Sequence, residues 1–599
     1  MFEKVLLSDE LFSGEKISFV ADPPELNDQG KVAFVAFMSP SSDYFLFTGA
    51  PGNLEVLARQ DSPAAGVPGE VYDSFNTDND KLTINPSGVV MFEGEVDAVS
   101  TNDSCLWIGT PGNVQLIGRE NGPAPDLVEE FFGSSPFFSS DSRLNRSGQI
   151  SLRSTRRGTS PKNGVWTGAP DDLKAAAMTG NPAPDVEVNY RDISGNKLSQ
   201  NGQIAFASSL NSSADKALFA GPPDALKKVF RFGEPCHGIA NAVYGGGASD
   251  GITSEFFNDD LLTYSLRISG TGINTGNDSA VWAGTPSSPQ LIVQEGDVLP
   301  GELGGGVIGT SDININSKGN LLFHSRLQNT SEDGLWWTET VSGTTHWIEV
   351  AREGALLAGL DVTLNSLQTT LAYSLSDNGD VIFYGTLAGD GISTTNDFVL
   401  LRWIPSSRTV QRIVQEGDTI EVAPGDLRTV SDFEFSGGPG HSASLSCGVN
   451  SRGQVAFMVS FANNTKGVMI ANRPSTFPDW VYQNELAPGQ DGFADDPNGD
   501  GVPNAMAYYL GFDAMENIDL SDRLHWNFDG ADVQLQIERD ATVTDLTARI
   551  EFSDALDGEW NPGPALNVAE SHGLTDTLSA TIAAAGEQGF VRLALTAPF

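Results

Sequence analysis

The sequence predicts an all-β fold built from repeats, and two recurring phrases predict it. The first is an Asn-x-x-Gly turn followed at once by an alternating apolar strand, which returns about every 60 residues. The second is an aromatic-Gly-x-Pro corner, followed by an apolar strand and a charged tail rich in Gly and Pro. A fixed period of this length indicates that one supersecondary unit is repeated along the chain.

The turns introduce short strands. Val, Ile, Phe and Trp alternate with polar residues between Gly, Pro, Asn and Asp clusters, which is typical of antiparallel strands, and each unit has room for about four of them. Ser replaces the Asn in two copies, and an eighth copy, at Asn258, Asp259 and Asp260, has lost its glycine. The other turns lie at 27–30, 85–88, 145–148, 199–202, 316–319, 376–379 and 450–453.

The two ends of the repeat region complement each other. Eight first-strand phrases are present but only seven full tails, because the last unit stops at 466–475. Residues 4–14 match the pattern of a tail such as 411–425. A terminal strand that completes the last unit leaves no exposed sheet edge, whereas a linear solenoid would require polar caps. We therefore predict an eight-bladed β-propeller over residues 1–475, closed by the N-terminal strand.

The pattern changes after residue 475. We expect a linker at 476–515 that contains a calcium-loop-like segment and one short helix, and no helix before residue 480. Alternating strands then predict a small C-terminal β-sandwich-like domain at 516–599. The three cysteines, Cys105, Cys236 and Cys447, never form a CxxC pair, which predicts buried free thiols.

Composition excludes several classes of partner. The net charge of −44, from 34 basic and 78 acidic residues, repels phosphate backbones, so we expect no nucleic-acid partner. No stretch reaches the roughly 20 apolar residues of a membrane span, so we expect no membrane insertion. The first residues lack a basic region and an apolar run, so they are not a signal peptide. We expect a monomer.

The segment 496–504 has the oxygen pattern of a calcium loop. Side-chain oxygens lie at loop positions 1, 3, 5 and 9, a backbone carbonyl at position 7 and Gly501 at position 6. Ala507 stands at position 12, where a bidentate Glu is usual, so Asp491 or Asp495 would have to supply the missing oxygens. The alternative is a helix entry rich in Asx turns. The candidate Ca²⁺ ligands are Asp496, Asn498, Asp500, Val502 and Asn504.

The same segment carries a resemblance. DPNGDGVPNAMAYYLGFD resembles the DxDGDGxxNxxEYxLG element, related to thrombospondin type 3 and dockerin loops, that joins exported bacterial proteins to a C-terminal β module. The repeats resemble those of large secreted proteins of planctomycetes and verrucomicrobia, with NxxGxVAF and GxPGxLxxVAREGDPAPG phrases. The resemblance implies a repeat propeller at an extracellular or cell-surface location, and it implies no substrate.

Three further features have a functional and a structural interpretation. Asn-Asp loops at Asn102, Asn277 and Asn396 either hold cations on one rim or form hairpin turns. Tail arginines beside carboxylates either recognise an acidic glycan or tie blades together as ion pairs; they are Arg59, Arg119, Arg231 and Arg352. Two long Gly-rich insertions, at 245–260 and 433–446, interrupt the repeat.

The insertions hold the candidate ligand-binding loops, around Asn258, Asp259, Asp260 and His441. The histidines fall in no metal-binding spacing such as HxxxH, and the chain has no GxSxG motif, no phosphate loop and no dinucleotide fingerprint. We therefore predict an extracellular or cell-surface protein that binds carbohydrate or another protein through propeller-face loops, without catalysis. The alternatives are a glycan hydrolase or lyase that uses carboxylates at the channel mouth, and a structural calcium-binding surface component.

Overall fold

The computed structural model describes most of the chain. The described residues are 2–76, 82–97, 103–127, 131–133, 142–157, 163–245, 251–257, 261–299, 307–308, 313–328, 332–341, 344–368, 373–437, 447–529, 532–553, 555, 558–572, 574–583 and 590–597. They divide into two compact units, residues 2–471 and residues 472–599. Each unit is described by itself.

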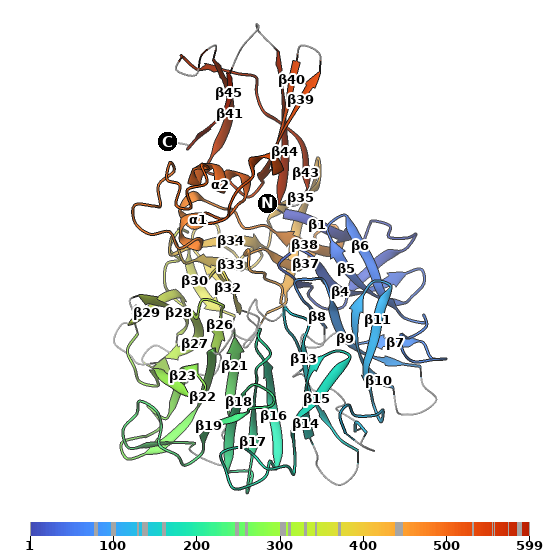
Figure 1. Cartoon of the computed structure of the whole chain (residues 1–599), viewed down its shortest axis with the longest axis vertical. Helices are drawn as coiled ribbons and strands as arrows, with labels where there is room; N and C mark the ends of the chain where they lie inside the picture. The colour runs from blue at the N-terminus through green and yellow to red at the C-terminus, as the bar shows by residue number, and fades with distance from the viewer. Residues whose placement is uncertain are drawn as a thin grey trace. The chain divides into compact units, whose positions relative to one another are not determined.

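Residues 2–471 are all-β, and the described residues form eight antiparallel sheets of four or five strands. Figure 1 shows the sheets following one another in chain order, from the blue β4–β6 to the yellow β32–β34. The first four are β2 (Lys16–Val20), β3 (Glu25–Leu26), β4 (Val32–Ser39), β5 (Tyr44–Ala50) and β6 (Asn53–Arg59); β7 (Tyr72–Phe75), β8 (Leu82–Ile84), β9 (Val90–Val96), β10 (Ser104–Thr110) and β11 (Asn113–Arg119); β12 (Arg143–Leu144), β13 (Ile150–Thr155), β14 (Asn163–Ala169) and β15 (Asp172–Met178); and β16 (Asp192–Leu198), β17 (Ile204–Ser209), β18 (Lys216–Gly221) and β19 (Lys227–Arg231).

The other four sheets follow the same plan. They are β20 (Ala242–Tyr244), β21 (Thr253–Phe257), β22 (Leu261–Gly270), β23 (Ser279–Thr285) and β24 (Ser288–Gln294); β25 (Val307–Ile308), β26 (Ile313–Ile315), β27 (Leu321–Leu327), β28 (Asp333–Val341) and β29 (Thr344–Arg352); β30 (Thr363–Leu367), β31 (Tyr373–Leu375), β32 (Val381–Ala388), β33 (Phe398–Ile404) and β34 (Thr409–Gln415); and β35 (Thr419–Ala423), β36 (Asp426–Phe435), β37 (Val455–Phe461), β38 (Lys466–Ala471) and β1 (Phe2–Leu7).

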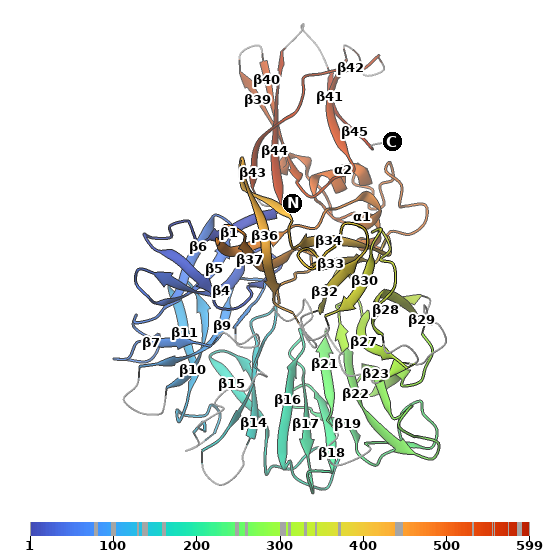
Figure 2. The ribbon, with the colours of Figure 1, turned by 180° about the vertical axis from the view of Figure 1, so that it is seen from behind.

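The first and last sheets are in contact. β1 pairs antiparallel with β38 and holds in its sheet the outer place that β6 holds in the first, as Figure 2 shows for β1, β36 and β37. The inner strands of successive sheets are in contact: β3 with β8, β8 with β12, β12 with β16, β16 with β21, β21 with β26, and β26 with β31. In addition, β37 of the last sheet contacts β3 of the first. One apolar cluster joins Val5 and Val468 to Phe34 and Phe47 of the first sheet. The fold is therefore β-propeller-like.

The core lies between neighbouring sheets. Trp107, Trp166 and Trp282 are fully buried at the same place in their repeats. Their indole N–H groups donate to the carbonyls of Ala65, Pro125 and His237, at 2.8–3.0 Å. A buried indole that finds an acceptor adds specificity to its large apolar contact area, so the aromatic of the corner phrase is a packing residue. The three cysteines are buried and free of disulfides, as predicted.

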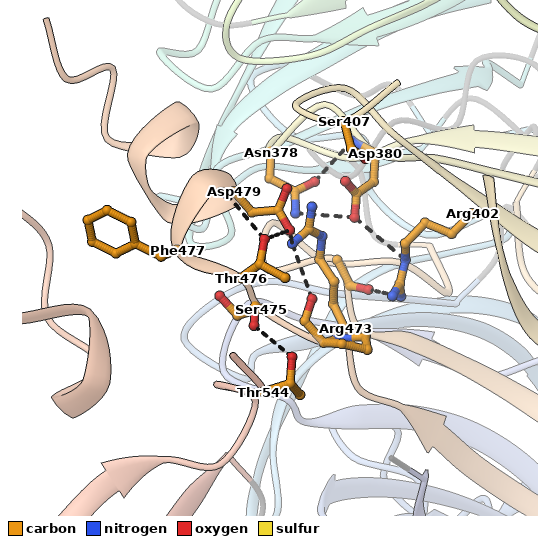
Figure 3. A network of polar contacts seen from close by, with 12 residues as sticks. Asn378, Asp380, Arg402, Ser407, Arg473, Ser475, Thr476, Phe477, Asp479 and Thr544 are labelled. Atoms are coloured by element: carbon orange, nitrogen blue, oxygen red, sulfur yellow. Dashed lines mark hydrogen bonds and ion pairs between the residues drawn. The ribbon is translucent and has the colours of Figure 1, made fainter. Parts of the chain in front are cut away.

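Residues 472–599 form a second unit with its own core. Two short helices are present where the sequence predicts one: α1 (Phe477–Gln483) and α2 (Asn504–Leu510), followed by the 3-10 helix η1 (Leu520–Asp522). Thr476 caps α1 by accepting the N–H of Asp479, and Arg473 pairs with that carboxylate at 3.4 Å (Figure 3). No helix among the described residues is long and apolar enough to cross a membrane.

The helices pack with the C-terminal strands. Tyr508 and Leu510 of α2 lie in one apolar cluster with Ile537 and Ile550, so the predicted linker and the predicted C-terminal domain share a core. The strands form two sheets among the described residues: β39 (Leu524–Asp529), β40 (Asp532–Asp540), β44 (Thr575–Ala583) and β43 (Asn567–His572); and β42 (Asn561–Pro562), β41 (Thr547–Ser553) and β45 (Phe590–Thr596).

Candidate functional site

Hydrogen bonds within each Asn-x-x-Gly turn stabilise it, as the first copy shows. The Oδ1 atom of Asn27 accepts the backbone N–H groups of Gln29 at 3.0 Å and of Lys31 at 2.9 Å. Gly30 has φ +75°, a left-handed conformation that glycine adopts without steric cost. The pattern therefore reflects a turn requirement, as Asn bonds its own backbone and Gly permits the reversal.

The same asparagines also join neighbouring turns. In four turns the Nδ2 atom donates to a backbone carbonyl of the turn in the next repeat: Asn27 to Asn85 at 2.9 Å, Asn145 to Ser199 at 3.1 Å, Asn316 to Ser376 at 3.2 Å, and Asn450 to Asn27 at 3.0 Å. The last of these bonds links the eighth repeat to the first. The Nδ2 atom of Asn85 is buried with no hydrogen-bond partner among the described residues. The sequence predicted the turns, whereas the bonds between turns depend on a neighbour about 60 residues away.

Arg146 links turns that are not neighbours. It follows Asn145 in the third turn, and its guanidinium pairs with Asp377 of the seventh turn and with Asp28 of the first, the latter at 3.5 Å. The two carboxylates therefore lie close together around one cation. This cluster was not predicted from the sequence; its only signal there is that a basic residue stands at the second position of one turn, where three other copies carry Asp.

At the seventh turn, where Ser376 stands in place of Asn, an arginine makes the link to the next turn. Ser376 has no amide with which to reach the next turn, but Arg402 donates to the carbonyl of Gly453 in that turn. Arg402, 2% exposed, also pairs at 3.5 Å with Asp380, which is fully buried. In Figure 3 the guanidinium of Arg402 points toward this carboxylate. The substitution in the turn is thus accompanied by a charged link from β33.

The tail arginines form the predicted ion pairs, but most do not tie sheets together. Arg59 pairs with Asp43 at 2.6 Å, Arg231 with Asp215 at 2.8 Å, and Arg352 with Glu332 at 2.9 Å. In each case the carboxylate lies just before the third long strand of the same sheet. Each pair therefore joins the end of the fourth strand to the start of the third long strand of the same sheet.

The Asn-Asp loops have turn geometry. The side chain of Asn277 accepts the N–H of Asn274 and donates to the carbonyl of Gly272. Asn396 repeats both bonds with Ser393 and Gly391. These contacts support the hairpin-turn interpretation for the two loops. Asn102 lies outside the described residues.

Two sets of candidates lie outside the part of the chain that the structure describes. They are the loop residues Asn258, Asp259 and Asp260, and His441. Among the described residues, no group of three or more His, Cys, Asp or Glu side chains is arranged to hold a metal ion.

The calcium-loop-like segment is tightly turned. Asp496 accepts the N–H groups of Gly499 and Gly501, at 2.9 and 2.8 Å. Asp500 accepts those of Val502 and Ile518, and these bonds hold its pKa below the usual range. Asn498 accepts the N–H of Asp500 at 3.1 Å. The segment therefore presents ionised oxygens around a short backbone loop.

The remaining predicted ligands differ in their surroundings. Asn504 is 1% exposed and its amide N–H₂ donates to the carbonyls of Gln490 and Gly492, while its Oδ1 is buried with no hydrogen-bond partner in the described structure. Asp491 and Asp495 accept backbone N–H groups of Gly489 and Gly492. Ala507 is buried in α2 and offers no ligand.

The fourth repeat leaves a tyrosine hydroxyl without a partner. Tyr72 and Tyr244 accept the N–H groups of Ala65 and His237, at 3.1 and 3.2 Å. The matching hydroxyl of Tyr190 is buried and unpaired among the described residues, and Pro184, which has no N–H, stands near the corresponding place.

This difference predicts opposite results for one substitution. Tyr72→Phe and Tyr244→Phe should each lower the free energy of unfolding by about 1 kcal/mol, because each removes a hydrogen bond. Tyr190→Phe should leave stability unchanged or raise it, since the lost hydroxyl has no partner. Urea denaturation followed by tryptophan fluorescence measures the three changes. Equal losses at the three positions would contradict the assignment.

The repeats, the sheets in cyclic contact and the turns that link them define a β-propeller-like repeat protein. The model of the family of unknown function DUF7453 matches residues 9–348 and 328–475, which is more than half of the chain. The chain belongs to this family. A comparison with curated proteins finds no match.

Solved structures with a similar arrangement are remote. A puromycin-hydrolysing peptidase of Mycobacterium tuberculosis is 12% identical with a TM-score of 0.35, over 74% of this chain and 58% of the peptidase. An oligogalacturonate lyase in complex with manganese is 9% identical with a TM-score of 0.33, over 79% and 99%. The β-propeller domain of the Trilobed protease from Pyrococcus furiosus is 10% identical with a TM-score of 0.34, over 67% and 100%. The chain thus spans little more than half of the peptidase.

Proposed function

We propose that residues 2–471 form an eight-bladed propeller whose last blade is completed by β1. Three observations support this: eight sheets among the described residues, the outer place of β1 beside β38, and the bond from Asn450 to Asn27. We further propose that the strands after residue 516 form a β-sandwich-like module. A rigid ring of this kind presents its connecting loops on two faces, where binding residues can vary without loss of the scaffold.

We propose that this protein is exported and binds carbohydrate or another protein at a propeller face, without catalysis. The observation that carries the proposal is the arrangement of the two carboxylates at the turns, Asp28 and Asp377. Both pair with the guanidinium of Arg146, which belongs to a third turn, so they link turns of the scaffold. Binding is then left to the loops that such a scaffold carries.

Affinity electrophoresis of the whole chain in gels that contain plant, algal or bacterial polysaccharides tests this proposal. We expect retarded migration in at least one gel, together with no new reducing ends and no unsaturated products after long incubation. Unretarded migration in every gel leaves protein partners as the predicted ligands. Product formation that is lost in Asp28→Asn or Asp377→Asn would instead establish the hydrolase or lyase alternative.

We also propose that the loop at 496–504 binds Ca²⁺ and stabilises residues 472–599. The buried, unpaired Oδ1 of Asn504 favours it, because a buried polar oxygen without a partner is costly and a cation would satisfy it. The residues of the loop match a calcium site in part. The ion would be held by the side-chain oxygens of Asp496, Asn498, Asp500 and Asn504 and by the carbonyl of Val502. Water would take the place of the ligand at loop position 12.

Calcium should therefore raise the melting temperature of this unit by several degrees relative to excess chelator. Asp496→Ala should abolish the shift, whereas Asp532→Ala, at the exposed start of β40, should preserve it. Differential scanning calorimetry of the whole chain measures both. A melting temperature that does not respond to calcium would show that the loop is an Asx-turn entry to α2.

A further inference from the structure

A depression in the fourth repeat has the properties of a ligand site. It has a volume of about 670 Å³ and lies between the segment that connects β15 to β16 and the turn that follows β17. Small-molecule sites commonly have volumes of roughly 300–1,000 Å³. The depression belongs entirely to residues 2–471, and it is distinct from the turns and from the calcium-loop-like segment.

Two opposite charges line the depression and are free to bind. Glu187 and Arg191 are both exposed, and neither side chain makes a hydrogen bond or ion pair with another described residue. A carboxylate offers two acceptors and a guanidinium offers a fork of donors, so together they suit vicinal hydroxyl groups.

The other lining groups complete a mixed surface. Asn189 donates to the carbonyl of Gly180 at 2.8 Å, which fixes its amide and leaves its Oδ1 for a ligand, while Asn211 adds a second amide. Val188 supplies apolar surface. Leu210 and Tyr190, 3% and 4% exposed, are the buried members of the lining. The ring of Tyr190 packs against Phe206 and Phe219, and its hydroxyl is buried, so these two residues form the floor of the depression and the exposed polar groups are left to bind.

We propose that this depression binds a neutral disaccharide, with Glu187 and Arg191 as the main hydroxyl-binding groups. The inference rests on the proposed carbohydrate-binding function and assigns its site. The apolar side chains of Val188 and Leu210 beside several planar polar groups match a sugar ring, which presents both C–H and O–H surface. Acidic sugars are disfavoured, because Glu187 and the net charge of −44 repel their carboxylates.

Isothermal titration of the whole chain with maltose, cellobiose, lactose and digalacturonate tests the site. We expect at least one neutral disaccharide to bind at least about tenfold more tightly than digalacturonate. Glu187→Gln and Arg191→Gln should each weaken this binding about tenfold without a change in melting temperature, since both residues are exposed. Tyr190→Phe should bind like the parent protein, because the hydroxyl that it removes is buried. Glu55→Gln, on the exposed part of β6, is the control and should bind like the parent protein.

The outcomes separate the site from the function. If the parent protein binds a saccharide, and Glu187→Gln and Arg191→Gln bind it equally well, the site assignment is wrong and the proposed function stands. The same holds if polysaccharide gels retard the chain but none of the disaccharides binds. If neither disaccharide nor polysaccharide binds, the site assignment and the carbohydrate function both fail.

Discussion

Arg402→Met is expected to lower the free energy of unfolding of residues 2–471 by about 3–5 kcal/mol, because it removes the guanidinium that pairs with the buried carboxylate of Asp380. Arg402 is 2% exposed and Asp380 is fully buried. The variant also loses the bond to Gly453, which links the seventh repeat to the eighth. Urea denaturation followed by the fluorescence of the buried tryptophans measures the change.

A double variant separates the charge effect from the packing effect. Asp380→Leu with Arg402→Met removes both charges and should recover most of the loss, to within about 1–2 kcal/mol of the parent protein, because a buried ion pair is worth little more than apolar residues of its size. A double variant as unstable as Arg402→Met would show that the bond to Gly453, rather than the ion pair, carries the stability.

Gly467→Val is expected to have a similar effect at the contact between the first and last repeats. Gly467 of β38 pairs with Leu7 of β1, and a Cβ atom at this glycine would lie 2.1 Å from the carbonyl oxygen of Leu6. Backbone cannot yield as a flexible side chain does, so β1 must leave β38 and expose Leu6 and Leu7. We expect a loss of about 3 kcal/mol or more.

Hydrogen exchange localises this effect. Amides of β1 should be protected in the parent protein and exchange rapidly in Gly467→Val, while those of β22 and β23 remain protected. Gly251→Ala is the matched control, because nothing lies within 4 Å of the added atom, and it should change stability by less than about 0.5 kcal/mol. Unchanged protection of β1 in Gly467→Val would mean that β1 is not held by this pairing.

The sequence predicts well those features that depend on a short stretch of chain. The Asn-x-x-Gly turns follow from the backbone bonds of Asn27 and the left-handed Gly30, and the strands follow from alternation. The complementary ends of the repeat region predicted that residues 4–14 would join the last unit, and β1 does pair with β38. The helix α1 was missed, because its seven residues are too few to show a helical period.

Contacts between distant repeats cannot be predicted from the sequence in the same way. Nothing near Arg146 in the chain indicates that Asp28 and Asp377 surround it, since this depends on which repeats meet. The bond from Arg402 to Gly453 compensates for Ser376, but the sequence does not show that these residues lie near one another.

Native mass spectrometry of the whole chain with a neutral disaccharide tests most directly whether this protein is a binder and not an enzyme. We expect a one-to-one complex whose added mass is that of the intact disaccharide, still intact after prolonged incubation. The appearance of a monosaccharide, free or bound, would contradict the proposal that the protein binds sugars without catalysis.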